Sequence, residues 1–554
     1  MNKRMRIGLV AVLGVSFFFY SSKLADDYFE ISKNLDIFAN IYKQLNIYYV
    51  DDTQPGQLMK TGIDAMLESL DPYTVYYPES EIEDYRFMTT GEYGGIGALI
   101  RRRGDRVMVA EPYEGFPAQK NGLMAGDILL KIDGKDLTGK NTSQISSLLK
   151  GQAKTDVEVV YSRDGEESTA TLARENIKIK DVPYYGMLTD KVGYIKLTGF
   201  TETASSEFVA AFKDLKNNQG MESLVFDLRG NGGGLLNEAV NIVNVFVDRG
   251  QEVVYTRGKL KEWDRSHRAL NNAIDKDIPI VVLINGSSAS ASEIVSGTIQ
   301  DLDRGVLVGE RSFGKGLVQQ TKPLSYNSQL KVTVAKYYIP SGRCIQKLDY
   351  SKKSNGKATE VPDSLRQTFY TKGGRPVKDG KGIEPDVEVE LPDAANITAS
   401  LVGKDFIFDF ATEYRRSHDT LIPANKFVVG DDLYGEFVQY LDGKDYDYTT
   451  RSERLLEQFK EASEKDHYFE QLKEEYEELH SKMSHNKSED LQLHQEEIRE
   501  ILANEIVSRY FYQTGRIENS LSLDIQVNKA IEVLESPEEY KQILTAKKSG
   551  GKEK

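Results

Sequence analysis

Cysteine and positive charge are both in short supply in this sequence. Cys344 is the single cysteine among 554 residues, so an intrachain disulfide and a zinc site built from thiolates are both excluded. The formal net charge is −15, which argues against nucleic acid as a partner because phosphate binding needs a basic face.

A long apolar run is also missing. The apolar stretch at residues 7–20 has 14 residues, fewer than the ~20 that a membrane-spanning helix needs. Three basic residues, Lys3, Arg4 and Arg6, precede it directly, which is typical of an export signal. No clean cleavage pattern follows the run. Residues 1–25 are therefore predicted to be a signal peptide or a retained membrane anchor, with the protein in the bacterial periplasm or cell envelope.

Histidine, the usual general base of serine hydrolases, is scarce. The chain has six, of which five lie in the polar C-terminal region and one lies in a charged segment, "WDRSHRALN". No histidine is therefore a persuasive partner for a catalytic serine in a Ser-His-Asp triad. The six are His267, His418, His467, His480, His485 and His494.

The chain is too long for one compact core, and its patterns predict four regions after the N-terminal segment. Apolar residues recur every three to four positions in residues 26–90, which predicts helices. Short strand patterns between turn residues in 91–176 predict a small barrel-like module. Strands alternate with helices in 177–395, which predicts an α/β region with a partly parallel sheet. Residues 396–554 are polar and helical.

Four serines lie close together in "NGSSASASEIVSG", residues 285–297. A buried strand, "IPIVVLING", precedes them and a helix is predicted from about Ser290. A serine at such a turn lies beside the unpaired N–H groups of the helix N-terminus, which can stabilise an oxyanion. Ser290 has the best position, next to the Ala291 N–H. The alternative is an ordinary N-cap serine in a turn of small residues.

A lysine can replace histidine as the base when burial lowers its pKa. "GERSFGKGLVQQ" places Lys315 between two glycines, with Gln319 four residues later. If the following residues form a strand, the two side chains point to the same face. The alternative is an exposed lysine in a glycine turn.

The glycine run in "VFDLRGNGGG" lacks the residue spacing of a phosphate-binding loop. We expect it to supply a second amide for the oxyanion. Asp227 and Arg229 either brace this loop or form an ordinary ion pair.

Three blocks, "LVFDLRGNGGG", "SSASASEIVSGTIQD" and "GERSFGKGLVQQ", occur in the order that is typical of carboxy-terminal processing proteases, also called tail-specific proteases. Lys315 and Gln319 follow Ser290 by 25 and 29 positions, which is similar to that family's spacing. The resemblance covers roughly residues 30–393. It implies a multi-domain chain: an α/β protease core of the crotonase/Clp-like kind, an inserted PDZ domain, and helical N- and C-terminal regions.

The resemblance also implies roles for individual residues. Ser290 is then the nucleophile, Lys315 the general base and later the acid, and Gln319 the residue that orients Lys315. The amides of Ala291 and Gly234 form the oxyanion hole. Gly232 stands where family members often have proline. This departure changes the local backbone, and so it bears on the assignment of the Gly234 amide to the oxyanion hole. No metal or organic cofactor is implied.

The module at 91–176 resembles a PDZ domain. In its "YGGIGA" stretch, the amides of Gly95, Ile96 and Gly97 are expected to bind the C-terminal carboxylate of a substrate, unless they form a simple glycine turn at the barrel edge. The partners implied are proteins or peptides with free C-terminal tails, and the N- or C-terminal helices suggest a homodimer.

The resulting prediction is an exported serine endopeptidase. A non-catalytic PDZ adaptor or pseudoprotease scaffold, and a small-ligand-binding protein, remain alternatives.

Overall fold

The computed structural model describes residues 28–354, 357–446, 448–483 and 487–545. The chain divides into two compact units: one comprises the residues up to 79 together with 319–333, and the other comprises the rest. Within the described ranges, no helix is long and apolar enough to cross a membrane. The apolar run at 7–20 lies outside them.

The first unit is built from two helices and a few strands. Residues 28–48 are helical, followed by α2 (Pro55–Glu68), which begins with proline at its first position, and by β1 (Val75–Tyr77). β1 pairs antiparallel with β18 (Gln329–Tyr338) at residues 329–331, and β17 (Leu317–Pro323) also pairs with β18. Of the described residues in the predicted helical region, 28–48, α2 and α3 (Ile82–Thr90) are helical, whereas β1 is a strand between the two prolines that break the pattern.

Residues 92–178 form the small β-rich module that the turn-separated strand patterns predict. Its elements are β2 (Glu92–Gly95), β3 (Ala98–Arg103), β4 (Arg106–Pro112), α4 (Pro117–Lys120), β5 (Ile128–Ile132), β6 (Lys135–Asp136), α5 (Thr142–Leu149), β7 (Asp156–Arg163), β8 (Glu166–Ala173) and β9 (Glu175–Lys178). Five strands pair in the order β3-β4-β5-β7-β8, and β2 pairs with β9. β3 is at one end of this order, where a sheet can accept an added strand.

The predicted α/β region contains a six-stranded sheet in the order β10-β11-β12-β15-β16-β23. Its strands are β10 (Tyr184–Met187), β11 (Val192–Lys196), β12 (Ser223–Asp227), β15 (Ile280–Ile284), β16 (Val306–Gly309) and β23 (Val387–Glu388). β10 runs antiparallel to β11, and every other neighbouring pair is parallel. β12 and β15 are buried along their whole length, as their continuous apolar sequences predict.

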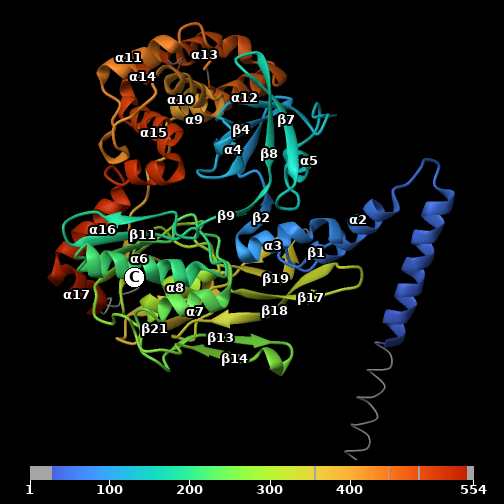
Figure 1. The fold of residues 1–554 in the computed structure, drawn as a ribbon, viewed down its shortest axis with the longest axis vertical. Helices are drawn as coiled ribbons and strands as arrows, with labels where there is room; N and C mark the ends of the chain where they lie inside the picture. The colour runs from blue at the N-terminus through green and yellow to red at the C-terminus, as the bar shows by residue number, and fades with distance from the viewer. Residues whose placement is uncertain (1–27, 355–356, 447, 484–486, 546–554) are drawn as a thin grey trace, which may run out of the picture. The chain divides into compact units, whose positions relative to one another are not determined.

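Helices cover both faces of this sheet, and Figure 1 draws one group of them in green and the other in red. One face packs against α6 (Ala204–Asn218), α7 (Leu236–Val243) and α8 (Ala291–Asp301). The other face packs against α16 (Ile525–Glu535), whose apolar residues share a buried cluster with those of β11, β12, β15 and β16. The last part of the chain therefore forms a layer of the α/β core.

The remaining strands of the second unit form smaller sheets beside this core. β13 pairs with β14 and with residues 335–338 of β18, and the other four strands form two hairpins, β19–β20 and β21–β22. Their bounds are β13 (Glu252–Gly258), β14 (Arg265–Arg268), β19 (Leu348–Ser354), β20 (Lys357–Glu360), β21 (Thr368–Tyr370) and β22 (Pro376–Lys378).

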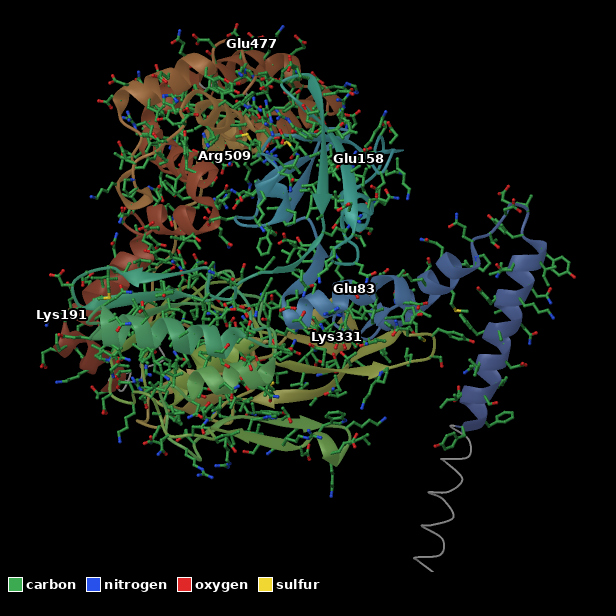
Figure 2. All side chains as sticks on the ribbon, in the orientation of Figure 1. Glu83, Glu158, Lys191, Lys331, Glu477 and Arg509 are labelled. Atoms are coloured by element: carbon green, nitrogen blue, oxygen red, sulfur yellow. The ribbon has the colours of Figure 1, made fainter. Side chains whose placement is uncertain are left out.

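The C-terminal region is helical, as its amphipathic patterns predict. Its helices are α9 (Asn396–Gly403), α10 (Phe406–Ser417), α11 (Asp431–Tyr440), α12 (Arg451–Lys465), α13 (Phe469–Met483), α14 (Lys487–Leu493), α15 (Gln495–Ser520), α16 and α17 (Pro537–Thr545). α15 is kinked at Tyr512, whose φ of 53° and ψ of −152° are not helical. Arg509 of α15, labelled in Figure 2, donates to the carbonyl oxygen of Phe408 and to Thr412 Oγ1 of α10.

Charged contacts join this helical region to the β-rich module. Arg101 of β3 donates to Asp405 at the start of α10 over 2.5 Å, and Arg103 donates to both carboxylate oxygens of Asp409. Arg516 of α15 pairs with Glu111 of β4. Because these groups are partly exposed to solvent, their number says little about stability, but they fix which surfaces meet.

Candidate active site

The predicted site residues of the α/β core follow parallel strands at their carboxyl ends, where open α/β sheets bind their ligands. β12 ends at Asp227 and is followed by the glycine loop, residues 230–234. β15 ends at Ile284 and is followed by the serine turn, residues 285–290. β12 and β15 are adjacent in the sheet, with Asp227 opposite Leu283, so the two loops begin side by side.

Ser290 is the N-cap of α8, and its backbone is strained. Its φ of 57° is uncommon for a residue with a Cβ, and its side chain is half-buried. Ala291 is the first residue of α8, so its N–H is one of the amides without an acceptor inside the helix. The other serines of the turn have different positions. Ser288 and Ser292 are buried and donate to backbone carbonyls, whereas Ser287 is exposed.

A buried carboxylate, Glu293, links the serine turn to the segment that contains Lys315. Its Oε2 accepts hydrogen bonds from the backbone N–H of Ser290 and from that of Lys315, each at 2.8 Å. Its Oε1 accepts from Ser312 Oγ at 2.6 Å and from the Gly314 N–H at 2.7 Å. Both backbone nitrogens bond to the same oxygen at 2.8 Å. The distance between the nitrogens of Ser290 and Lys315 therefore cannot exceed the sum of these two bonds.

The environment of Glu293 has two opposing effects on its ionisation. Complete burial raises the pKa of the Glu293 carboxyl group above its usual value, and the four hydrogen bonds reduce this rise without cancelling it. Four donors to two oxygens match a carboxylate, which accepts hydrogen bonds and donates none. The side chain of Lys315 itself is half-buried.

Asn231 connects the glycine loop to the serine turn. Its carbonyl oxygen accepts from the Ala289 N–H at 3.0 Å and from Ser292 Oγ at 2.9 Å. Its side-chain oxygen accepts from the Gly233 N–H at 2.9 Å, and its side-chain nitrogen donates to the carbonyl oxygen of Leu197. This buried asparagine therefore holds the loop against the first turn of α8.

The loop approaches Ser290 so closely that only glycine fits. At Gly233, with φ of 98°, an added Cβ would lie 2.8 Å from the Cβ of Ser290 and 2.9 Å from the nitrogen of Ala291. At Gly234, with φ of 153°, it would lie 2.4 Å from the carbonyl oxygen of Phe200. The Gly233 N–H donates to Asn231, whereas no hydrogen bond from the amides of Gly234 or Ala291 is found among the described residues.

Asp227 and Arg229 brace the start of the glycine loop. Asp227 is fully buried and accepts from Nε and Nη2 of Arg229 at 3.0 and 2.7 Å, from Lys196 Nζ at 3.1 Å and from the Tyr194 hydroxyl at 2.6 Å. Burial by itself would raise the pKa of Asp227, but the charges of Arg229 and Lys196 outweigh it and lower the pKa. The pair is therefore a buried structural bridge and not a solvent-exposed one.

The other predicted site residues are placed as follows. Gln319 lies in β17, in the first unit, where its Nε2 donates to Thr333 Oγ1 at 3.2 Å. The predicted carboxylate loop includes Gly95 at the end of β2 and the buried Ile96, whose carbonyl oxygen accepts from Ala118. Gly97 has a φ of 71°, and an added Cβ would meet Phe116 at 2.5 Å.

Sequence reasoning did not identify two residues that organise this site. Glu293 follows Ser290 by three positions, so the Ser-x-x-Glu pattern of a capping box was a signal for it. Asn231 lies within the glycine run and gave no comparable signal, because its role depends on contacts with residues far away in the sequence.

Family sequence models match three parts of the chain. "Peptidase family S41" matches residues 191–351, "PDZ domain" matches 94–173, and "Probable PDZ-protease, C-terminal helical domain" matches 397–534. Together with the fold, these matches define a serine-type peptidase that contains a PDZ domain.

Comparison with individual proteins narrows this class. A "Carboxy-terminal-processing protease" of Bartonella bacilliformis is 37% identical over 319 residues, which are 57% of this chain and 73% of that protein. A "Probable CtpA-like serine protease" of Staphylococcus aureus is 32% identical over 68% of this chain and 69% of that protein. The solved "Photosystem II D1 C-terminal processing protease" is 29% identical over 64% of this chain and 92% of its own, with a TM-score of 0.35.

The chain belongs to the carboxy-terminal processing proteases of peptidase family S41, as the resemblance of its motifs predicts. It is a PDZ-containing serine-type peptidase, and the relatives are named as proteases. This membership sets aside the non-catalytic adaptor and the small-ligand-binding protein that the sequence left open.

Replacing Glu293 with glutamine is expected to disrupt the site. The amide nitrogen of glutamine cannot accept, so at least one of the three backbone N–H groups loses its acceptor, at a cost of about 1–3 kcal/mol. We expect a lower melting temperature and a fall in peptide hydrolysis of more than about tenfold. Glu222→Gln is the matched control, because Glu222 is 63% exposed and pairs with the surface residue Lys191, which is labelled in Figure 2. Wild-type hydrolysis by Glu293→Gln would show that the carboxylate does not organise the site.

Proposed function

We propose that the chain is an exported endopeptidase that cleaves protein tails through an acyl-enzyme on a Ser290–Lys315 dyad. The shared carboxylate oxygen carries this proposal: Glu293 Oε2 accepts from the backbone N–H of both residues at 2.8 Å. The strained N-cap position of Ser290 supports its role as the nucleophile, since strained backbones are concentrated at functional sites.

The chemistry follows the pattern of nucleophilic catalysis. Lys315, as the neutral amine, takes the proton of the Ser290 hydroxyl while the serine oxygen bonds to the scissile carbonyl carbon. The negative charge that develops on the carbonyl oxygen is stabilised by the amides of Ala291 and Gly234. Lys315 then gives its proton to the leaving amine, the peptide bond breaks, and water hydrolyses the acyl-enzyme in the same way. Gln319 is assigned the orientation of Lys315 by family resemblance.

The PDZ module is proposed to select the substrate by its C-terminus. Peptide substrates fit a PDZ domain, and the end position of β3 supports strand addition there. Gly95, Ile96 and Gly97 precede β3 directly and are assigned the carboxylate. The proposed division of the chain is 1–25, 26–90, 91–176, 177–395 and 396–554: N-terminal signal or anchor, helical region, PDZ domain, protease core and C-terminal helical domain.

The dyad is tested by hydrolysis of an unfolded protein with a free apolar C-terminus. We expect the chain from Asp26 onward to cleave it, and Ser290→Ala and Lys315→Ala to lower the rate by at least about 1,000-fold. Ser287→Ala is the matched control, because Ser287 lies exposed in the same turn, and it should keep full activity. Cleavage that survives both dyad substitutions would show that other residues carry the reaction.

The same assay tests the PDZ assignment when the substrate carboxylate is converted to an amide. Loss of this charge should raise KM without changing the site of cleavage, because the binding loop loses its charged acceptor. Equal KM values for the two substrates would contradict recognition of the C-terminus.

A homodimer through the N-terminal helix is proposed from its exposed apolar surface. Tyr28, Phe29, Leu35 and Tyr48 in residues 28–48 are all more than 60% exposed, and such surfaces mark protein contacts. Sedimentation of the chain from residue 26 is expected at the dimer mass, and removal of residues 26–50 should give the monomer. A monomer before the deletion would refute this contact.

Export to the periplasm or cell envelope is proposed from the basic cluster and the apolar run of residues 1–25, which act as a signal peptide or an anchor. Fractionation of bacterial cells should find the full chain outside the cytoplasm, and a chain lacking residues 1–25 inside it. A full chain in the cytoplasm would contradict export.

A further inference from the structure

Arg229, directly before the glycine loop, contacts a second carboxylate from the far end of the chain. Its Nη1 donates to Asp524 Oδ1 and to Gln526 Oε1, each at 3.0 Å, and its Nη2 lies 2.8 Å from Asp524 Oδ2. Together with the bonds to Asp227, these contacts surround the guanidinium on two sides. The side chain of Arg229 is 12% exposed.

Asp524 is itself fixed in place. It is the N-cap of α16, and its Oδ1 accepts from the backbone N–H groups of Gln526 and Val527 at 3.0 and 3.1 Å. Gln526 is fully buried and donates to the carbonyl oxygen of Val389 at 2.6 Å. α16 is packed on the sheet through Val527, Ala530 and Val533. The carboxylate is therefore presented to Arg229 by a rigid element of the core.

Asp524 balances the second positive charge beside Asp227. Two cations, Arg229 and Lys196, contact the buried carboxylate of Asp227, and Asp524 supplies the second negative charge. Without it, one positive charge would remain unbalanced in a site of low exposure, which is unfavourable because buried charges need partners. Arg229 would then compete with Lys196 for Asp227, directly before the loop.

The consequence for the loop follows from its connections. Arg229 is adjacent to Gly230, whose N–H donates to Asn285 Oδ1 at 3.1 Å, and the loop continues to the amide of Gly234. A shift of Arg229 is therefore transmitted along a short, glycine-rich segment that must lie against Ser290 and Ala291. A displacement of about 1 Å in such a site can cost about 100-fold in rate.

We propose that Asp524 is a positioning residue for the peptidase reaction: through Arg229, it holds the glycine loop in the geometry that binds the oxyanion. This inference rests on the proposed function, because it assigns to the loop the stabilisation of the transition state. The C-terminal helical region thereby supplies a residue that positions the glycine loop, in addition to its contacts with the PDZ module.

The variant that separates this role from helix capping is Asp524→Ser. Serine caps a helix about as well as aspartate, so α16 should remain folded while Arg229 loses its second carboxylate. We expect kcat for a peptide with a free apolar C-terminus to fall about 10- to 100-fold, with KM unchanged, because the loop acts in the transition state. Asp524→Asn retains a neutral acceptor and should show a smaller loss.

Labelling of Ser290 with a fluorophosphonate gives a second measurement. The phosphoryl oxygen of the adduct occupies the oxyanion position, so the labelling rate should fall in parallel with kcat. Glu532→Gln is the matched control: it removes a carboxylate from α16 that contacts Lys529 at 2.8 Å and is 63% exposed. It should leave kcat, labelling and the melting temperature unchanged.

The outcomes distinguish the inference from the proposed function. If the unmodified chain neither cleaves nor is labelled, the proposed function fails and the inference fails with it. If the unmodified chain is active and folded Asp524→Ser has the same kcat, or shows a change in KM alone, the inference is overturned and the peptidase stands. If Asp524→Ser does not fold at the assay temperature, Asp524→Asn decides the question by the same measurements.

Discussion

The carboxylate of Glu293 is the group on which the geometry of the site depends. It is fully buried, and a buried charge is tolerated only when hydrogen bonds replace its hydration. Here the backbone N–H groups of Ser290, Gly314 and Lys315 supply most of that replacement. The requirement to solvate one charge therefore fixes the nucleophile turn and the lysine segment relative to each other. Ser290 and Lys315, which are 25 positions apart, are therefore bonded to the same carboxylate. The hydrogen bond from the Ser290 N–H also stabilises the strained backbone of Ser290.

The same principle operates a second time at the glycine loop. Asp227 is buried, and its charge is satisfied by Arg229, Lys196 and Tyr194. Asn231 then uses its carbonyl and its side chain to attach the loop to the first turn of α8. Two buried acids thus organise the two sides of the site, one at the serine turn and one at the loop. Neither acid contacts the substrate in the proposed reaction.

Local sequence patterns predicted most of the fold of the core. The apolar strands β12 and β15 and the helix that begins at Ser290 followed from periodicity and capping rules, because these are properties of short segments. The layer that α16 forms on the sheet did not, because its Glu- and Lys-rich surroundings indicated only a polar helical tail. Glu293 lay within a recognisable capping pattern, but the bonds from Gly314 and Lys315 depend on a return of the chain that no local pattern encodes.

The position of α16 explains how a helical addition can be integral to an α/β peptidase. A sheet of apolar strands such as β12 and β15 must be covered on both faces, and α6, α7 and α8 cover only one. α16 covers the other with Val527, Ala530 and Val533, and its N-terminus thereby comes to the carboxyl end of β12, where Arg229 lies. Once the helix is placed by burial of apolar surface, a carboxylate at its N-cap is favoured by the helix dipole and by the guanidinium together. The packing of α16 on the sheet and the electrostatic attraction between Asp524 and Arg229 therefore favour the same position of the helix.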